Sequence, residues 1–313
     1  ISDNTFGIAL DNYDKSKILT IDPQLNFVTF SGSYSDNWGF SATYDNLGYA
    51  YGGGVAFGSS YPTTLGAYSS LFGGGSVDMS ISKFSPDGKK LIASTYLGGS
   101  GTEAPHSMIV NSKGELVIYG ASSSSNFPIV SNSYDKTFNG GISTEAGYLS
   151  FSNGTDIVLA KLNNDFTQLL SSTYYGGDNN DGINDGGEDL GLFRNYGDGN
   201  RGEVIVDKND NILISSVTIS SNLPTTNGFQ ITYGGGSQDG CVAKFNSNLS
   251  TLIFGSYFGG SGNDACYSIK QNGAGEIYIS GGTTSANLQE VSGSYNPSYS
   301  GSIDGFLARI SSN

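Results

Sequence analysis

Apolar residues along this chain come in short runs that polar residues and Gly, Asn, Asp or Pro interrupt. Stretches such as EVIVDKNDNILISS (203–216) and HSMIVNSKGELVIYG (106–120) carry alternating apolar positions on both sides of a polar turn. A period of two is typical of β-strands with one buried face, and a turn of this composition between two runs predicts a hairpin. The pattern therefore predicts an all-β protein.

The same group of strands returns along the chain. LIASTYLGGSG (91–101), LLSSTYYGGDN (169–179) and LIFGSYFGGSG (252–262) are copies of one pattern, and FVTFSGSYSDN (27–37) is a weaker copy. Each copy follows an apolar strand and a tight turn, and two more short strands come after it, which gives four strands per unit. The tyrosines that mark the repeat are Tyr34, Tyr96, Tyr174 and Tyr257.

A linker follows the fourth strand of every unit and holds two aromatic residues four positions apart. This spacing predicts one helical turn or a compact loop whose two rings pack together. We expect the rings to form core between neighbouring units, and a platform for a ligand is the alternative. The pairs are Tyr68 and Phe72, Tyr134 and Phe138, Phe229 and Tyr233, and Tyr295 and Tyr299.

Repeated four-stranded antiparallel units predict a β-propeller, in which radial repetition buries both faces of each small sheet. Residues 1–313 are therefore expected to form a single domain. The sequence contains three complete blades, Gly39–Tyr96, His106–Tyr174 and Glu203–Tyr257, and a fourth, Cys266–Ile310, that lacks its last strand. Further strands are predicted at the amino-terminal end, in FGIAL, KILTI and FVTFSG. They favour five blades, with four as the alternative.

The last units also carry a family resemblance. DGCVAKFNSNLSTLIFGSYFGGSGNDACYSIKQNGAGEIYISGGTTS (239–285), with SNLPTTNGFQ (221–230) before it, resembles the SBBP-type β-propeller repeat of large bacterial secreted and cell-surface proteins. The resemblance covers nearly the whole chain and is weakest in the first unit, where Ser35, Asp36 and Asn37 replace Leu-Gly-Gly or its equivalent. It implies an extracellular module of a long adhesin-like chain, frequently in gliding or biofilm-forming Gram-negative bacteria with a type IX export route. It implies no known catalytic residues.

Composition and charge narrow the choice of partner. The chain of 313 residues has 47 Gly, 20 Tyr, 17 Phe and only 13% charged residues, which suits one large β domain. Its 28 acidic residues against 14 basic ones give a net charge of −14, so nucleic acid and anionic lipid are repelled. Its apolar runs are far shorter than the ~20 residues that cross a bilayer, and neither membrane insertion nor a targeting segment is predicted. Few Lys and Cys beside much Ser, Thr and Asn favour a location outside the cell.

One unit carries an acidic insertion, DNNDGINDGGEDLGLFRNYGDGNRG (178–202), between its Gly-Gly turn and the next strand. A loop of this length in a compact domain is usually functional, metal-ordered or mobile. Calcium binds about 6 to 8 oxygens, and this loop offers them, although Gly182 and Ile183 do not fit the EF-hand pattern. A structural calcium and a solvated acidic loop are the two alternatives. The candidate ligands are Asp178, Asn180, Asp181, Asp185, Glu188 and Asp189, with Asn184 as a further oxygen donor.

The sequence gives little support to a catalytic function. The only histidine is His106, and its surroundings do not resemble a nucleophile elbow, so a Ser-His-Asp mechanism is not expected. One His and two Cys make a zinc site a poor expectation. A carboxylate pair of the glycosidase type is harder to exclude. Many acids nevertheless lie in or beside hairpin turns, where turn chemistry explains them. These are Asp87, Asp165, Asp207 and Asp210.

The two cysteines, Cys241 and Cys266, each begin a strand of the last unit, and these strands are expected to flank a third one. Positions so related lie about 10 Å apart in a regular sheet, whereas a disulfide needs Cα atoms within ~7 Å. Two buried thiols are therefore expected, and a disulfide is the alternative.

Taken together, these features predict a non-catalytic extracellular module that acts in adhesion, in binding or as a spacer. Its expected partners are a surface glycan, a protein or other domains of a longer chain. A secreted polysaccharide hydrolase or lyase with carboxylates on a propeller face is the alternative. A structural link in a surface filament is a third hypothesis, because partner strands could dock at the incomplete blade.

Overall fold

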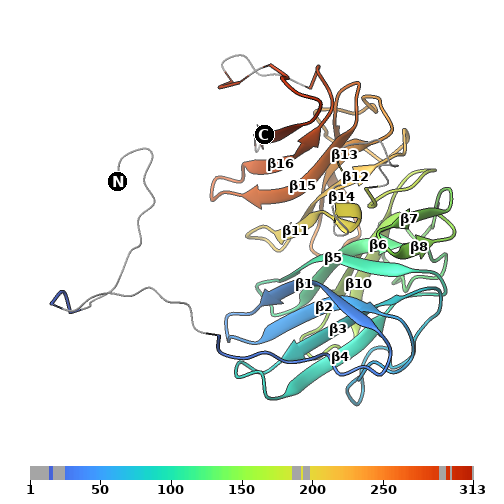
Figure 1. The fold of residues 1–313 in the computed structure, drawn as a ribbon, viewed down its shortest axis with the longest axis vertical. Helices are drawn as coiled ribbons and strands as arrows, with labels where there is room; N and C mark the ends of the chain where they lie inside the picture. Colours follow the sequence, from blue (N-terminus) through green and yellow to red (C-terminus); the bar gives the residue numbers. More distant parts are fainter. Residues whose placement is uncertain are drawn as a thin grey trace.

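The computed structural model describes residues 14–16, 25–184, 192, 198–288, 294–296 and 298–311. Within these residues 17 strands form five antiparallel sheets, and the one helical element is a short 3₁₀ helix, Asp198–Asn200. The all-β class predicted from the alternating pattern is therefore confirmed (Figure 1).

Four of the sheets follow one another along the chain, and each is built as an antiparallel meander. The first sheet consists of β1 (Asn37–Tyr44), β2 (Ala50–Ala56), β3 (Asp78–Phe84) and β4 (Leu91–Leu97). The second consists of β5 (Glu103–Val110), β6 (Leu116–Ser122), β9 (Asp156–Leu162) and β10 (Leu169–Tyr175). The third consists of β11 (Glu203–Val206), β12 (Ile212–Thr218), β13 (Asp239–Phe245) and β14 (Leu252–Phe258). The fourth has only β15 (Asp264–Gln271), β16 (Ile277–Thr283) and β17 (Asp304–Ile310). A small hairpin of β7 (Thr144–Ala146) and β8 (Leu149–Phe151) lies between β6 and β9.

In the second and third sheets, an asparagine side chain stabilises the turn between the third and fourth strands. Asn163 Oδ1 accepts hydrogen bonds from the backbone N–H groups of Thr167 (2.9 Å) and Gln168 (3.0 Å) at the β9–β10 turn. Asn246 caps the β13–β14 turn in the same way, through Ser250. These side chains satisfy backbone donors that the ladder cannot reach, so two distant segments adopt the same hairpin.

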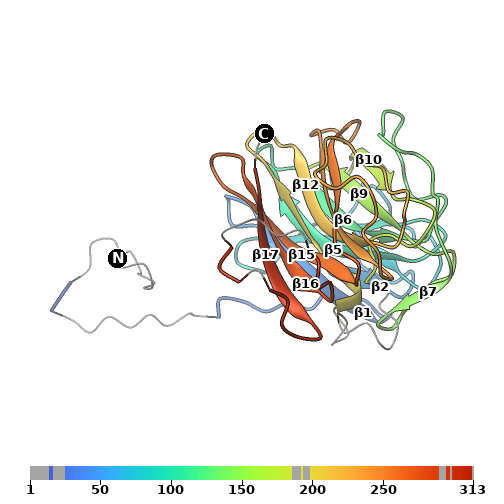
Figure 2. The same ribbon diagram turned by 90° about the horizontal axis from the view of Figure 1, so that it is seen from above.

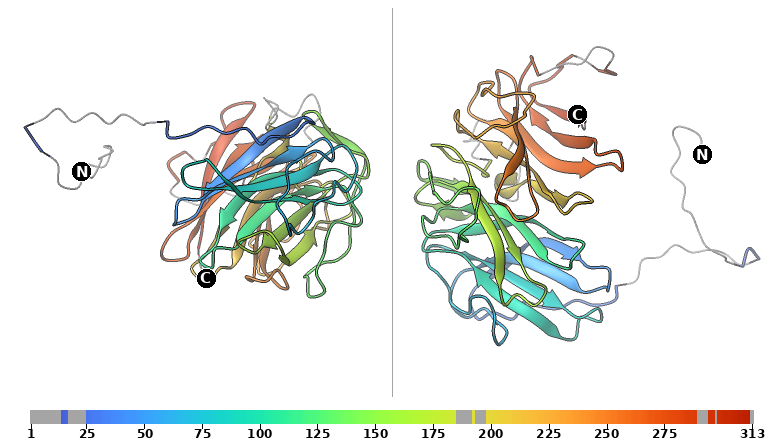
Figure 3. Two further views of the ribbon diagram at one scale, coloured as in Figure 1. Left: turned by 90° about the horizontal axis from the view of Figure 1, so that it is seen from below. Right: turned by 180° about the vertical axis from the view of Figure 1, so that it is seen from behind.

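The four larger sheets stand side by side in an arc (Figures 1 and 2). Their first strands contact one another in order, β1 with β5, β5 with β11, and β11 with β15. Separate apolar clusters fill the space between the first and second sheets, the second and third, and the third and fourth. No contact of similar extent joins β15 to β1 within the described ranges, so the arc is open there, as Figure 3 shows from two further sides.

The unit boundaries predicted from the repeat agree with the sheets. Three sheets have four strands, and the fourth sheet ends at β17 without a fourth strand. The predicted strand FVTFSG (27–32) is wrong in this structure, because residues 27–32 pair with no sheet. In the other units this strand pairs with the strand before it, and here the preceding segments FGIAL (6–10) and KILTI (17–21) lie outside the described residues. The count of five blades stays a prediction.

The prediction for the cysteines is corrected in one respect. Cys241 lies on β13 of the third sheet and Cys266 on β15 of the fourth, so they do not flank a strand of one sheet. The Cys241 side chain packs between the second and third sheets, and that of Cys266 packs between the third and fourth. Both are free thiols with no exposed surface, as expected. A Cβ at Gly240, beside Cys241, would lie 2.5 Å from the Cys266 sulfur, which shows how closely the two sheets approach.

Candidate functional site

A tyrosine of the fourth strand fastens each complete sheet to its own linker. In the second sheet the Tyr174 hydroxyl donates to the carbonyl of Ser124 (2.6 Å) and accepts from the backbone N–H of Phe127 (3.0 Å). Its ring is buried, and the two bonds satisfy the hydroxyl in an apolar setting. The same two bonds join Tyr96 to Gly58 and Tyr61, and Tyr257 to Ser220 and Leu223.

The aromatic residues of the linkers complete these tyrosine sockets. In three sheets the second member of the predicted pair packs against the strand tyrosine. The ring centroids are 6.2 Å apart for Phe72 and Tyr96, 5.9 Å for Phe138 and Tyr174, and 5.9 Å for Tyr233 and Tyr257. These rings are partly buried and pack within their own unit, whereas the expected contact between neighbouring units is made by Tyr134, which packs on Phe245 of the third sheet. The predicted helical turn is wrong, because the described linker residues form irregular loops.

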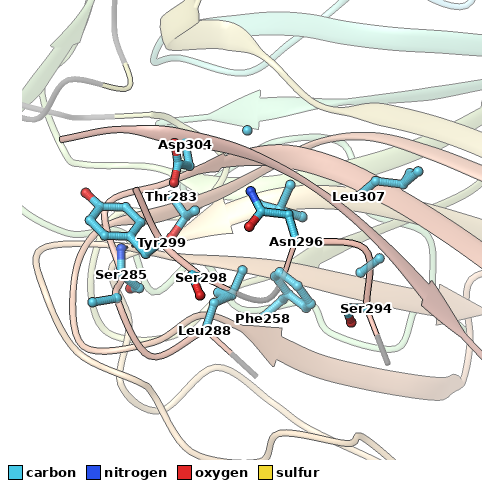
Figure 4. Close-up of a pocket in the computed structure, with 14 residues that line it drawn as sticks. Phe258, Thr283, Ser285, Leu288, Ser294, Asn296, Ser298, Tyr299, Asp304 and Leu307 are labelled. Carbon is cyan, nitrogen blue, oxygen red and sulfur yellow. Dashed lines mark hydrogen bonds between the residues drawn. The ribbon is translucent and has the colours of Figure 1, made fainter. Parts of the chain in front are cut away.

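The fourth sheet carries the same socket in an open form. A pocket of about 310 Å³ lies against β17, and Ser285, Leu288 and Tyr299 line it (Figure 4). In the complete sheets, the residue at the position of Ser285 supplies the carbonyl that binds the tyrosine, and the residue at the position of Leu288 supplies the backbone N–H group. The residue at the position of Tyr299 supplies the linker ring. We call this pocket the open socket.

The hydrogen bonds support this equivalence. In the second sheet Asn126 lies two positions after Ser124, and its Oδ1 accepts a hydrogen bond from the backbone N–H of Ser100 (2.8 Å). In the fourth sheet Asn287 lies two positions after Ser285, and its Oδ1 accepts a hydrogen bond from the backbone N–H of Ser261 (2.8 Å). The two segments therefore hold the same turn in the same way.

Pairs of buried carboxylates form a second recurrent feature, at the Gly-Gly turns. One acid begins the third strand of a sheet, and the other follows the Gly-Gly turn after that sheet. Glu103 and Asp264 begin β5 and β15, whereas Asp181 precedes the insertion and bridges to Thr218 on β12. The pairs are Asp78 with Glu103, Asp156 with Asp181, and Asp239 with Asp264, and all six are fully buried. They accept backbone N–H groups of the turns, such as Gly99 to Glu103 Oε2 (3.0 Å) and Gly260 to Asp264 Oδ2 (2.8 Å).

The first glycine of each turn lies between the two acids. A Cβ at Gly98 would lie 2.6 Å from Asp78 Oδ1 and 2.6 Å from Glu103 Oε2. Gly176 and Gly259 have the same surroundings in the next two turns. Only a residue without a side chain fits there, because a Cβ at such distances would overlap both oxygens.

Burial changes the protonation of these acids. Desolvation raises the pKa of Asp78 and of Asp156 to about 8, and the facing carboxylate adds to both rises. Desolvation also raises the pKa of Asp181 and of Asp239 to about 7. Two carboxylates so close cannot both ionise without a cost, so one acid of the pair Asp78–Glu103, and one of the pair Asp156–Asp181, is favoured in its protonated form near neutral pH.

The structure places three of the six predicted calcium ligands. Asp178 is exposed. Asn180, two positions later, is buried, and its Oδ1 accepts a hydrogen bond from the backbone N–H of Thr155 (3.1 Å). Asp181 is one of the paired acids, and its carboxylate accepts from Thr218 Oγ1, Ser220 Oγ (2.9 Å) and the Gly177 N–H (2.7 Å). Asn180 and Asp181 thus form the turn, as their counterparts do in other units.

The remaining candidates, Asp185, Glu188 and Asp189, lie outside the described residues. The described residues contain no group of three or more His, Cys, Asp or Glu side chains that could hold a metal ion. Asn184 directs its side chain inward, where Nδ2 donates to the Tyr267 hydroxyl (3.2 Å) and Oδ1 accepts from Gln238 Nε2 (2.7 Å). Calcium therefore stays a prediction that depends on the three acids not described.

His106 lies on β5 with its ring edge-on to Tyr119, the centroids 5.1 Å apart. Burial lowers the pKa of its imidazole to about 3, so the ring is neutral at physiological pH. Only 7% of the residue is exposed. The ring therefore packs as part of the interior between β5 and β6.

The carboxylate pairs were missed in the sequence, although a signal exists. An acid follows the Gly-Gly turn at the same spacing in GGSGTE (98–103), GGDNND (176–181) and GGSGND (259–264). A second acid follows the linker glycines in GGGSVD (73–78) and GGGSQD (234–239). Asp181 also belongs to the repeat, but many other Asp and Asn residues follow it in the insertion, so it was grouped with them.

Comparisons with known proteins give no family. No family model and no curated protein matches the chain. A protein of unknown function from Dyadobacter fermentans superposes with a TM-score of 0.43 at 11% identity, over 86% of this chain and 62% of that one. A protein from Bacteroides ovatus described as a "putative hydrolase" gives a TM-score of 0.30 at 14% identity, over 80% of this chain and 55% of that one. This chain spans less than two thirds of either protein, and superpositions this loose carry no argument about function.

No helix in the part of the chain that the structure describes has the length and apolar character needed to cross a membrane.

Proposed function

We propose that this chain is a non-catalytic β-propeller module of a secreted or cell-surface bacterial protein, which acts in adhesion, in binding or as a spacer. The four larger sheets correspond to blades of one domain, and their packing in order around an arc supports this architecture. Five blades require the amino-terminal strands to form one more sheet, and four blades require ring closure.

One observation carries the non-catalytic part of the proposal. The buried acids that could form a carboxylate pair for catalysis occur three times, with the same glycine between them and the same backbone donors. A catalytic site is formed once in a chain, whereas a turn that joins repeated sheets is needed at every junction. The recurrence therefore supports a scaffold role for these acids.

The proposed location and partners rest on surface chemistry. A net charge of −14 disfavours nucleic acid and anionic membranes. Loops rich in Ser, Thr, Asn and Tyr offer hydroxyl, amide and aromatic groups, which suit a surface glycan, a protein or another domain of a longer chain.

Glycan arrays and cell-adhesion assays with the purified chain test this function. The proposal predicts selective binding to one glycan or cell-surface class and no turnover of any polysaccharide. Absence of binding would remove the adhesive role and leave the spacer role. Glycan turnover that Asp185→Asn or Glu188→Gln abolishes, while Asp87→Asn in an exposed turn leaves it intact, would establish the alternative hydrolase or lyase.

A further inference from the structure

We propose that the open socket beside β17 receives a tyrosine-bearing strand, residues 29–34, from a second copy of this chain. The proposal concerns self-assembly, so it holds or fails independently of any glycan. It rests on the edge of the fourth sheet, on the lining of the open socket and on the exposure of Phe30 and Tyr34.

The edge of the fourth sheet is suited to accept a strand. In the third sheet β13 pairs with β14 along its length, from Gly240 opposite Phe258 to Phe245 opposite Leu252. The equivalent strand β17 pairs only with β16, so one edge has no strand beside it in the described residues. Leu307 on β17 is 78% exposed, and no described sheet packs on its face as the fourth sheet packs on Val242 at the same position of β13. An apolar edge with unpaired backbone groups is the usual template for strand addition.

The open socket selects for tyrosine within that strand. Its walls include Ser285, Leu288 and Tyr299, which are the fourth copy of the lining around Tyr96, Tyr174 and Tyr257. In the complete sheets this lining gives the tyrosine hydroxyl one donor and one acceptor, and it gives the ring an aromatic neighbour. The open socket therefore offers a complete set of partners for one tyrosine.

Residues 29–34 match the strand that is missing. Gly32-Ser33-Tyr34 has the same sequence as Gly255-Ser256-Tyr257 on β14. Phe30 is 91% exposed and Tyr34 is 100% exposed, although large aromatic side chains are usually buried. The segment thus has the sequence of a fourth strand and none of its packing.

The arrangement of the sheets places donor and acceptor far apart within one chain. Tyr34 stays beside the first sheet, because Ser35 N–H donates to Ser60 Oγ (2.8 Å) and Asn37 pairs with Ala56. A chain spans at most ~3.6 Å per residue, so these anchors keep Tyr34 close to β1. The open socket lies on the fourth sheet, at the other end of the arc (Figures 1 and 3). A second copy can place its first sheet against this fourth sheet, and repetition of that contact gives head-to-tail chains or rings.

Sedimentation velocity of the full chain over a range of concentrations tests the proposal, at ~0.15 M salt to screen the like charges. We expect concentration-dependent oligomers. Tyr34→Ala, on the donor, and Leu307→Lys, on the acceptor edge, should each weaken association at least tenfold. A mixture of the two variants retains one intact donor and one intact acceptor, so it should form one-to-one dimers and nothing larger.

Two exposed positions give matched controls. Ile142→Ala removes an exposed large side chain from the linker of the second sheet, and Leu65→Lys adds the same charge at an exposed leucine away from β17. Both should associate as the parent does, and all four variants should keep the parent's circular dichroism spectrum. A chain that stays monomeric at every concentration would overturn the proposal. So would association that Tyr34→Ala leaves unchanged. A monomer that Tyr34→Ala destabilises would show that the segment closes the ring within its own chain.

Discussion

The third and fourth sheets have closely similar third strands in different surroundings. DGCVAKF of β13 and DGFLARI of β17 follow the same pattern of small, apolar and basic residues. Six of the seven residues of β13 are buried, and none of β17 is. Two differences in surroundings explain this. β14 pairs with one edge of β13 and the fourth sheet packs on the face that carries Val242, whereas the described chain places neither a further strand nor a further sheet against β17.

This comparison separates what a strand's own sequence determines from what its neighbour supplies. The period of two decides that β17 forms and pairs with β16. The neighbouring sheet decides whether its face becomes core. Each complete sheet gains in addition one buried tyrosine that binds its linker, and the described fourth sheet lacks this contribution.

The largest expected effect comes from removing a tyrosine from a filled socket. Tyr174→Ala should lower the free energy of unfolding by about 3–5 kcal/mol, because it removes a buried ring and leaves Ser124 and Phe127 without a partner. Tyr174→Phe should cost about 1–2 kcal/mol, because only the hydroxyl is lost. Denaturant titration measures both. The matched change Tyr34→Ala, measured at a concentration where the chain is monomeric, should shift stability by less than ~0.5 kcal/mol. Equal effects of Tyr174→Ala and Tyr34→Ala would contradict the comparison.

A side chain between the paired acids should have the next largest effect. Gly176→Ala places a Cβ 2.6 Å from Asp156 Oδ1 and 2.8 Å from Asp181 Oδ2, and should destabilise the chain by about 1–3 kcal/mol. Gly273 in the β15–β16 turn is the control, since a Cβ there meets no atom within 4 Å. Thermal unfolding of both variants compares the two positions. A Gly176→Ala protein as stable as Gly273→Ala would show that the turn adjusts easily.

The acid pairs also predict how stability depends on pH. Asp78 has a folded pKa of about 8 against an ordinary value of 3.8, so the folded chain holds a proton that the unfolded chain releases. The stabilisation from this proton is full below pH ~4 and is lost as pH rises toward 8. Asp78→Asn should therefore flatten the decline of the melting temperature between pH 5 and 8 (about the window set by these pKa values) and stabilise the chain at the alkaline end.

Asp304 provides the control for that change. It opens β17 as Asp78 opens β3, and it accepts the backbone N–H of Ser300 at 2.9 Å. The described residues place no fourth strand and no Gly-Gly turn after β17, so Asp304 lacks the facing acid. Asp304→Asn should leave the pH dependence of the parent unchanged. An identical pH profile for Asp78→Asn and the parent would argue against proton sharing in the pair.

Calcium should have the smallest effect. If the acids of the insertion bind the ion, saturating calcium raises the melting temperature through its preference for the folded chain, and a chelator reverses the rise. A combined Asp185→Asn and Glu188→Gln variant should lose the response, whereas Asp87→Asn should keep it. No response of the parent to calcium would favour a solvated loop.

The sequence predicted the strands well because their signals are local. Alternating apolar residues and Asn or Gly turns locate β11, β12 and their counterparts, and the repeat locates the unit boundaries. The prediction of three strands for the fourth unit agrees with the described fourth sheet, because it required only a comparison of units.

The blade bounds taken from the repeat separate Cys241 from Cys266 correctly, and the error lay in the separate assignment of both cysteines to one unit. Likewise, the spacing of Tyr134 and Phe138 suggested that they contact each other, yet Tyr134 packs on Phe245 of the third sheet. The acids Asp156 and Asp181 meet only because two sheets meet. These contacts depend on packing between units, which periodicity along one strand does not encode.

Amide hydrogen exchange, followed by mass spectrometry on the dilute monomeric chain, tests the central comparison most directly. The account predicts strong protection of peptides from β3, β9 and β13 and much faster exchange in β17, where one edge has no strand to accept or donate hydrogen bonds. Protection of β17 equal to that of β13 would contradict it, since some segment would then already occupy the place of the fourth strand.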